Sequence, residues 1–232
     1  MIEVIIKELR VKASIIRIFN YLQTKKKKKN YKRYLYTFAP IFYILMEHEI
    51  LKCKELLLQG KILLYPTDTV WGIGCDATNE EAIKKIYAIK QRQESKSMII
   101  LLDSTDRLPV YVTKIPLIAW DLITHTHRPT TYIYPTAQNL PKTLIHSDGT
   151  IAIRITTNPF CKKLIKALEK PLVSTSANIS GDVTPVLFSE IPQEVIDLVD
   201  YVVPQEYADS IEYKPSRLVK FIDDYNFIVI RE

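Results

Sequence analysis

Apolar and polar positions along residues 46–232 follow two periods in turn, one typical of helices and one typical of strands. Glu49–Gln59 has apolar residues at helical spacing and ends before Gly60, a usual position for a glycine that ends a helix. The next stretch, Lys61–Tyr65, is a short apolar run that ends at Pro66, as expected of a buried strand. We therefore expect this part of the chain to begin with a helix followed by a strand.

The alternation continues to the end of the chain. We expect further helices over Thr78–Ile89, where Thr78–Glu81 has the pattern of a capping box, and over Pro116–Thr124, Asn158–Leu168 and Ser189–Val199. Predicted strands are Ser97–Leu102, Thr131–Tyr134, Thr150–Ile155, Pro171–Thr175, Arg217–Ile222 and Phe227–Ile230. Interleaved helices and strands predict a single α/β domain with a mixed sheet.

Positive charge is concentrated at the N-terminal end. Residues 1–45 carry 11 lysines or arginines and two glutamates, whereas the remainder carries 21 basic and 24 acidic side chains. The net charge of +6 therefore belongs to this leader, and bulk charge argues for nucleic-acid binding only there.

Three interpretations of the leader stay open. The run Lys25–Lys29 with the aromatic-rich Tyr31–Tyr43 suits an RNA-binding arm, because lysines pair with phosphates and aromatic rings stack on bases. The leader also suits a disordered extension, or a stretch upstream of a true start at Met46. We expect a leader over residues 1–45 and the folded domain over residues 46–232.

Composition excludes several protein classes. The hydrophobic fraction of 47% and charged fraction of 25% are those of an ordinary globular domain. Cys53, Cys75 and Cys161 are scattered, which argues against a disulfide framework or a zinc site and fits a reducing cytosol. No apolar run is long enough to span a bilayer, so we expect a cytoplasmic protein without a membrane partner.

Glycine is scarce, with five in the chain. Neither a GxxxxGK[ST] loop nor a GxGxxG turn is present, which removes the two commonest backbone cradles for phosphate. If a nucleotide binds, cationic and hydroxyl side chains must hold its phosphates.

The first candidate segment, Tyr65–Asp76, runs from a strand into alternating hydroxyls and glycines. Thr67 and Thr69 can bind a small polar substrate, and Gly72 and Gly74 permit close approach of the backbone. Ligands commonly bind at strand ends in α/β sheets, although the same residues also suit a polar turn.

A cluster of cations ends the predicted second helix. Lys90, Arg92 and Lys96 are close enough in sequence to surround a polyphosphate. The helix dipole favours cations at this end in any case, so a purely structural role stays open.

Pro171–Gly181 is an apolar strand that ends in small hydrogen-bonding residues. Ser174, Ser176 and Asn178 suit a phosphate or the polar groups of a substrate, and equally an ordinary polar turn.

Arg154 stands inside the apolar strand Thr150–Ile155. A buried arginine is costly unless it is paired, so either a carboxylate partner or an anionic ligand is expected. His125 and His127 alternate just before Arg128-Pro129, without acidic or cysteine partners at metal-ligand spacing, and we expect a surface pair.

Together these segments resemble the YrdC-like threonylcarbamoyl-adenylate synthase family over Met46–Glu232. The marks of that family occur in order as Tyr65–Ala77, Lys90–Lys96, Ile151–Arg154 and Ser174–Gly181. The resemblance implies a twisted sheet with one concave, positively lined pocket. It implies an enzyme that condenses L-threonine, bicarbonate and ATP, with Mg²⁺ accompanying the nucleotide. The product would pass to a separate tRNA threonylcarbamoyl-transferase complex.

The resemblance also implies roles for individual residues. Threonine would be placed by Thr69, Arg154 and Ser174. The implied catalytic set, which would bind ATP, is Lys90, Arg92, Ser176 and Asn178. Further contacts with the nucleotide would come from Lys96, Thr150, Thr184 and Arg231.

This sequence departs from the family pattern in places. Gln93 and Ser97 replace residues that are proline or glycine in many members, and His127–Thr131 replaces a glycine-containing WPGP segment, which affects one pocket wall. A YciO-like nucleotide- or RNA-binding protein without this activity therefore stays open, as does a nucleic-acid-binding module aided by the leader. A carbamoyl-transfer domain of hydrogenase-maturation type is disfavoured, because its zinc fingers and acylphosphatase part are absent from this sequence.

Overall fold

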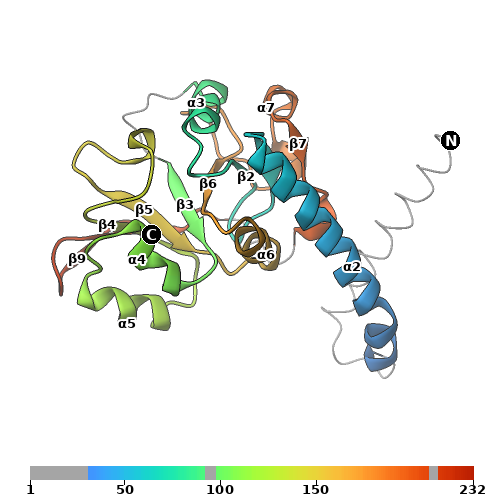
Figure 1. Ribbon diagram of the computed structural model, residues 1–232, viewed down its shortest axis with the longest axis horizontal. Coiled ribbons are helices and arrows are strands. Elements are labelled where there is room, and N and C mark those ends of the chain that lie inside the picture. The colour runs from blue at the N-terminus through green and yellow to red at the C-terminus, as the bar shows by residue number, and fades with distance from the viewer. Residues whose placement is uncertain (1–30, 92–97, 209–213) are drawn as a thin grey trace.

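The computed structural model describes residues 31–91, 98–208 and 214–232, with side chains from residue 41 onward. Within these ranges the strands form one nine-stranded sheet in the order β7-β1-β2-β6-β3-β5-β4-β8-β9 (Figure 1). The strands are β1 (Leu63–Tyr65), β2 (Gly72–Gly74), β3 (Ile99–Leu102), β4 (Thr130–Tyr134), β5 (Ile151–Ile155), β6 (Leu172–Ser176), β7 (Tyr201–Val202), β8 (Arg217–Phe221) and β9 (Phe227–Arg231). Parallel and antiparallel pairs both occur, which confirms the predicted α/β fold with a mixed sheet.

Six α-helices accompany the sheet in the described residues. They are α2 (Tyr31–Leu58), α3 (Glu80–Ile89), α4 (Leu108–Tyr111), α5 (Leu117–His125), α6 (Pro159–Leu168) and α7 (Gln193–Leu198). Short 3₁₀ turns cover Thr105–Arg107, Lys142–Leu144, Phe188–Glu190 and Gln205–Tyr207. Among these helices we find none with the length and apolar character needed to cross a membrane.

Two predicted helix ends are confirmed by their hydrogen bonds and backbone angles. Asn158 caps α6, because its side-chain oxygen accepts a hydrogen bond from the backbone N–H of Cys161 at 3.0 Å. Gly60 follows α2 with φ of +71°, a left-handed conformation that a glycine adopts without strain.

The predicted capping box at Thr78 is wrong. The cap of α3 is Asn79, whose side-chain oxygen accepts from the backbone N–H of Ala82 at 3.0 Å. Thr78 lies one residue before the cap, where its backbone N–H and its hydroxyl both donate to the Asp76 carboxylate, at 2.8 and 2.7 Å.

The predicted helix Ser189–Val199 is also wrong in its extent. A 3₁₀ turn covers Phe188–Glu190, and α7 begins only at Gln193. Pro192 explains the break, since a proline disfavours helical angles in the residue before it, and Ile191 is extended with ψ of 125°.

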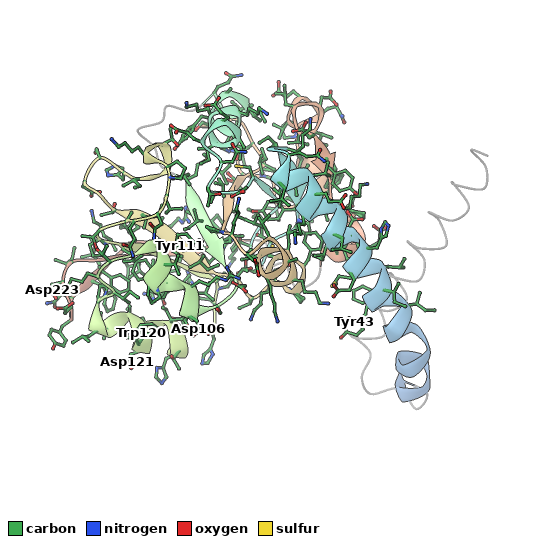
Figure 2. All side chains as sticks on the ribbon, viewed as in Figure 1. Tyr43, Asp106, Tyr111, Trp120, Asp121 and Asp223 are labelled. Carbon is green, nitrogen blue, oxygen red and sulfur yellow. The ribbon has the colours of Figure 1, made fainter. Side chains whose placement is uncertain are left out.

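Helix α2 is longer than the predicted Glu49–Gln59 and begins at Tyr31. It lies beside α6, and its first turns extend beyond the body of the described chain, where Tyr43 is visible on its outer part (Figures 1 and 2). One stripe of the helix is buried, at Phe42, Met46, Ile50, Cys53 and Leu57. These residues follow the three- and four-residue spacing of a helix face, which accounts for the extension of the helix from Glu49 back to Phe42.

The predicted division of the chain at Met46 falls inside this helix. Phe42 lies before the division, is only 6% exposed and packs with its ring centroid 6.3 Å from that of Tyr207. The leader assignment stays a prediction for residues 1–30, which lie outside the described residues.

Helices cover the two faces of the sheet unequally. On β1, Leu63 belongs to the core under α2 and α6, whereas Leu64 belongs to the core under α3 and α5, because neighbouring side chains of a strand point to opposite faces. The face under α2 and α6 is covered along β1 and the end of β3, while its continuation over β5, β4 and β8 carries the cavity described below.

We predict that Phe42→Ala lowers the free energy of unfolding by about 3 kcal/mol, because it leaves a cavity between α2 and the 3₁₀ turn that contains Tyr207. The matched control is Ile44→Ala on the same helix, where the side chain is 68% exposed and the expected change is within about 0.5 kcal/mol. Urea unfolding of both variants measures the difference. Equal midpoints would show that the helix before Met46 does not support the domain.

Candidate functional site

A cavity of about 480 Å³ lies over the part of the sheet that α2 and α6 leave open. Its floor is formed by alternate side chains of β4 and β5, such as Ile133 and Ala152. Seven residues that the family resemblance implicates line it together: Thr69, Thr150, Arg154, Ser174, Ser176, Thr184 and Arg231. They come from segments as far apart in sequence as the turn after β1 and the C-terminal strand.

The serines reach the cavity through the register of β6. Leu172, Ser174 and Ser176 point to one face, so the same strand packs Leu172 under the helices and places both serines in the open part. Gly72 on β2 lies opposite Ser176 in the sheet. A Cβ at Gly72 would lie 3.1 Å from the Ser174 hydroxyl oxygen, so glycine leaves this wall of the cavity room for a ligand.

The turn after β1 satisfies its own backbone and also lines the cavity. The Thr67 hydroxyl donates to the Val70 carbonyl at 2.7 Å and accepts from the backbone N–H of Thr69 at 3.1 Å. It also lies 3.0 Å from the Thr69 hydroxyl. The geometry of this turn is therefore compatible with both expected roles, a polar turn that satisfies its own backbone and a turn that faces a ligand.

Arg154 was expected to have either a carboxylate partner or an anionic ligand, and its position is compatible with both. Its guanidinium lies 3.3 Å from the Asp68 carboxylate, with both side chains at most 4% exposed, and it lines the cavity. The Asp68 oxygen that faces Arg154 also accepts from the Thr156 hydroxyl at 3.2 Å. Among the described residues, the Arg154 Nε atom has no hydrogen-bond partner. The ion pair fixes the guanidinium without using all of its donors.

A second guanidinium, that of Arg231, enters the same cavity. It donates twice to the Ser216 carbonyl, at 3.0 and 2.8 Å. Partial burial, followed by the nearby charge of Arg154, lowers the pKa of Arg231 below its usual value. Two guanidinium groups that repel each other in one cavity form a site whose free energy falls when an anion binds between them.

Lys90 and Asn178 lie behind the cavity wall instead of lining it. Lys90 is 1% exposed, and its ammonium group donates to the backbone carbonyls of Ser176 at 2.6 Å and Asn178 at 2.7 Å. The Ser176 hydroxyl in turn donates to the Asn178 side chain at 2.5 Å. In this structure Lys90 therefore holds the loop after β6 in place. Arg92 and Lys96 lie outside the described residues.

The sequence patterns did not single out two further lining residues, His146 and Ser216. His146 Nδ1 lies 2.9 Å from the Asp148 carboxylate, which also accepts from the Thr150 hydroxyl at 2.6 Å and from Lys220 at 3.0 Å. The Thr150 hydrogen bond is the largest cause of the lowered pKa of Asp148. The sequence feature that could have indicated His146 is the Asp148-Gly149 turn. This turn bends the chain back, so that His146 and Thr150 lie side by side.

The donor set offers little to a metal ion. In the parts of the chain that the structure describes, no three His, Cys, Asp or Glu side chains gather. The polar groups that line the cavity are hydroxyls, two guanidinium groups and the His146 imidazole, without a carboxylate. Such a lining suits a cation that arrives with bound phosphates and water, not one held by the protein alone.

Comparison with known proteins gives a consistent result. The profile of the Sua5–YciO–YrdC family, described as "Telomere recombination", matches residues 55–232. A threonylcarbamoyl-AMP synthase of Pseudoalteromonas translucida is 39% identical over 159 residues, which are 67% of this chain and 85% of that protein.

Two solved structures share the fold. P. abyssi Sua5 complexed with L-threonine superimposes with a TM-score of 0.71 at 25% identity over 78% of this chain. E. coli YciO superimposes with a TM-score of 0.67 at 25% identity over 79% of this chain. The matched region is 53% of the Sua5 chain and 88% of YciO, so this chain spans about half of the Sua5 structure.

We predict that Lys90→Met lowers the free energy of unfolding by roughly 3 kcal/mol, because the buried Asn178 carbonyl and the partly buried Ser176 carbonyl lose a charged donor. Lys84→Met on the same helix is the control. That lysine is 46% exposed, and its ion pairs with Glu80 and Glu81 are surface pairs worth at most about 0.5 kcal/mol each. Thermal unfolding of both variants checks the difference, and an equal effect would contradict the role assigned to Lys90.

Proposed function

Because the chain belongs to the Sua5–YciO–YrdC family, we propose that it is a threonylcarbamoyl-AMP synthase. It would condense L-threonine, bicarbonate and ATP and release pyrophosphate. The observation that carries the proposal is the shared cavity, in which Arg154 and Arg231 meet hydroxyls from several other segments of the chain. Those groups are the ones that a glycine-poor protein needs to hold a triphosphate beside an amino acid.

Threonine would bind at the inner end of the cavity. Arg154 is suited to the carboxylate of the amino acid, because a guanidinium can donate two parallel hydrogen bonds. Thr69 and Ser174 supply neutral hydroxyls on either side for the remaining polar groups. The Asp68 carboxylate orients the guanidinium, so its direction is set before the substrate arrives.

ATP would occupy the wider part of the same cavity. Ser176, Thr150 and Thr184 supply hydroxyls, and Arg231 supplies the second positive charge. Lys90 and Asn178 would act on the nucleotide through the Ser176 loop, which they hold by hydrogen bonds. The contributions of Arg92 and Lys96 to the phosphates remain part of the proposal.

The chemistry needs positioning and charge stabilisation more than a protein nucleophile. The threonine amine attacks the bicarbonate carbon, water leaves and N-carboxythreonine forms. Its carboxylate oxygen then attacks the α-phosphorus of ATP while the bond to the pyrophosphate oxygen breaks. The guanidinium groups stabilise the charge that develops on the phosphate oxygens, and Mg²⁺ carried by the phosphates would neutralise more of it.

The product would be handed to a tRNA threonylcarbamoyl-transferase complex, and a contact with RNA through the leader belongs to the same proposal. A YciO-like protein without synthase activity is the second candidate, because the matched region accounts for 88% of E. coli YciO but about half of Sua5.

The two candidates are separated by pyrophosphate release from ATP, measured with and without bicarbonate and with L-threonine, L-serine or no amino acid. We expect release that depends on both bicarbonate and threonine. ATP binding without threonine-dependent release would favour the YciO-like alternative.

We predict that Arg154→Lys raises the KM for threonine about ten- to a hundredfold, because a lysine cannot donate the paired hydrogen bonds of a guanidinium. Arg217→Lys is the matched control: it is also a strand arginine in an ion pair, with Glu232, and it does not line the cavity. Steady-state pyrophosphate release measures both variants. An unchanged threonine KM in Arg154→Lys would remove this residue from the threonine site.

A further inference from the structure

The floor of the cavity contains an apolar surface between its polar groups. Ala152 on β5 lies opposite Ile133 on β4, and Leu218 on β8 continues this surface. Polar groups flank it along the same strands, as Thr150 and Arg154 do on β5. If threonine and the phosphates take the polar groups, the apolar surface is left for the flat, largely apolar part of ATP, which is its nucleobase.

A short turn brings His146 to the edge of this apolar surface. The backbone N–H of His146 donates to the Thr150 carbonyl at 3.0 Å, just before β5 begins. Lys220, which lies opposite Ile133 in the sheet, donates to the Asp148 carboxylate at 3.0 Å. The turn is therefore tied to the sheet from β5 on one side and from β8 on the other, and His146 lines the cavity.

The Asp148 carboxylate determines which nitrogen of the His146 ring carries the proton. It accepts hydrogen bonds from the hydroxyl and the backbone N–H of Thr150, at 2.6 and 3.1 Å, and from Lys220, so it stays ionised and can only accept. Nδ1 of His146, 2.9 Å away, must therefore donate to it. The backbone N–H of Asp148 also points toward Nδ1, but at 3.4 Å this contact is too long to reverse the arrangement. In the neutral ring the proton is thus on Nδ1, and Nε2 carries a lone pair.

That lone pair gives the cavity a group that can only accept a hydrogen bond. Nε2 belongs to the edge of the ring opposite Nδ1, and the His146 side chain is 44% exposed, so a ligand in the cavity can reach this edge. The guanidinium groups of Arg154 and Arg231 can only donate, and the hydroxyls can do either. An obligate acceptor selects a ligand that presents a donor. Adenine presents one in its exocyclic amino group, where hypoxanthine and guanine carry a carbonyl oxygen.

We propose that His146 is a specificity-determining residue for the nucleotide, whose Nε2 accepts a hydrogen bond from the exocyclic amino group of an adenine lying on Ile133, Ala152 and Leu218. Asp148 is then a positioning residue, which acts by fixing the tautomer of the ring. This inference rests on the proposed function, because it takes ATP as the nucleotide that the cavity binds.

The test compares nucleotides that differ at the position of the exocyclic amino group. ATP has the amino group, purine riboside triphosphate has a hydrogen atom in its place, and inosine triphosphate has a carbonyl oxygen. Equilibrium binding to the full chain should be about three- to tenfold tighter for ATP than for purine riboside triphosphate, the difference made by one hydrogen bond. Inosine triphosphate should bind more weakly than either, because its carbonyl oxygen faces the Nε2 lone pair.

Variants separate a contact with the base from a general effect on the cavity. His146→Ala should weaken ATP binding while leaving purine riboside triphosphate unaffected, so that the ratio of the two affinities falls to about one. Asp148→Ala, which frees the tautomer, should reduce the preference for ATP over inosine triphosphate. The matched control is His125→Ala on α5, an exposed histidine outside the cavity whose Nδ1 contacts the Asp121 carbonyl of its own helix, and it should leave both ratios unchanged.

The tautomer can be measured directly on the unaltered chain. In mildly alkaline buffer, where an imidazole is ordinarily neutral, ¹⁵N chemical shifts should show a protonated Nδ1 and an unprotonated Nε2 at His146. Addition of ATP should move the Nε2 signal further than addition of purine riboside triphosphate does.

The proposal is overturned if His146→Ala keeps the preference for ATP, or if the neutral ring carries its proton on Nε2. An unaltered chain that releases pyrophosphate with threonine but binds ATP and purine riboside triphosphate equally well would overturn this inference and leave the proposed synthase activity intact. If ATP does not bind to the chain at all, both fail.

Discussion

The buried ion pair between Asp68 and Arg154 is the interaction on which the site depends. Two charges at most 4% exposed are expensive to remove from water, and the cost is offset only while each holds the other in good geometry. The pair joins the turn after β1 to β5, which are separated in the sheet by β2, β6 and β3. It therefore fixes the distance between the turn that presents Thr69 and the strand that presents Arg154. Loss of either partner would leave a buried charge and release both walls of the cavity.

The distribution of helices explains why a cavity exists at this place. Helices α2 and α6 cover one half of a sheet face and pack on apolar side chains, while the other half carries small and hydroxyl side chains. The same strands supply both halves: Leu172 is under the helices and Ser174 is in the cavity, two residues apart on β6. On the opposite face, α5 packs Ala119 into the core and turns Trp120 and Asp121 outward (Figure 2). Alternation along the strands thus places different chemistry on the two sides of one sheet.

Local signals predicted much of the fold. Gly60 and Asn158 mark helix ends by backbone and capping chemistry that involves only neighbouring residues, and both were predicted correctly. Strand β2 was not predicted, because a three-residue Gly-Ile-Gly segment has no strand pattern of its own and forms through its pairing with β1 and β6. The position of Lys90 behind the loop could not be predicted from the sequence either, since it depends on carbonyls 86 and 88 residues away. Arg154 shows the same limit: its position predicted a partner, and only the fold identified Asp68.

A single structure can test whether threonine and the nucleotide share the cavity over β5, β4 and β8, as we propose. Crystals of the full chain grown with L-threonine and a non-hydrolysable ATP analogue provide the measurement. We expect the threonine carboxylate within hydrogen-bonding distance of the Arg154 guanidinium and the phosphates between Ser176 and Arg231. Threonine bound on the other face of the sheet, or phosphates outside this cavity, would contradict it.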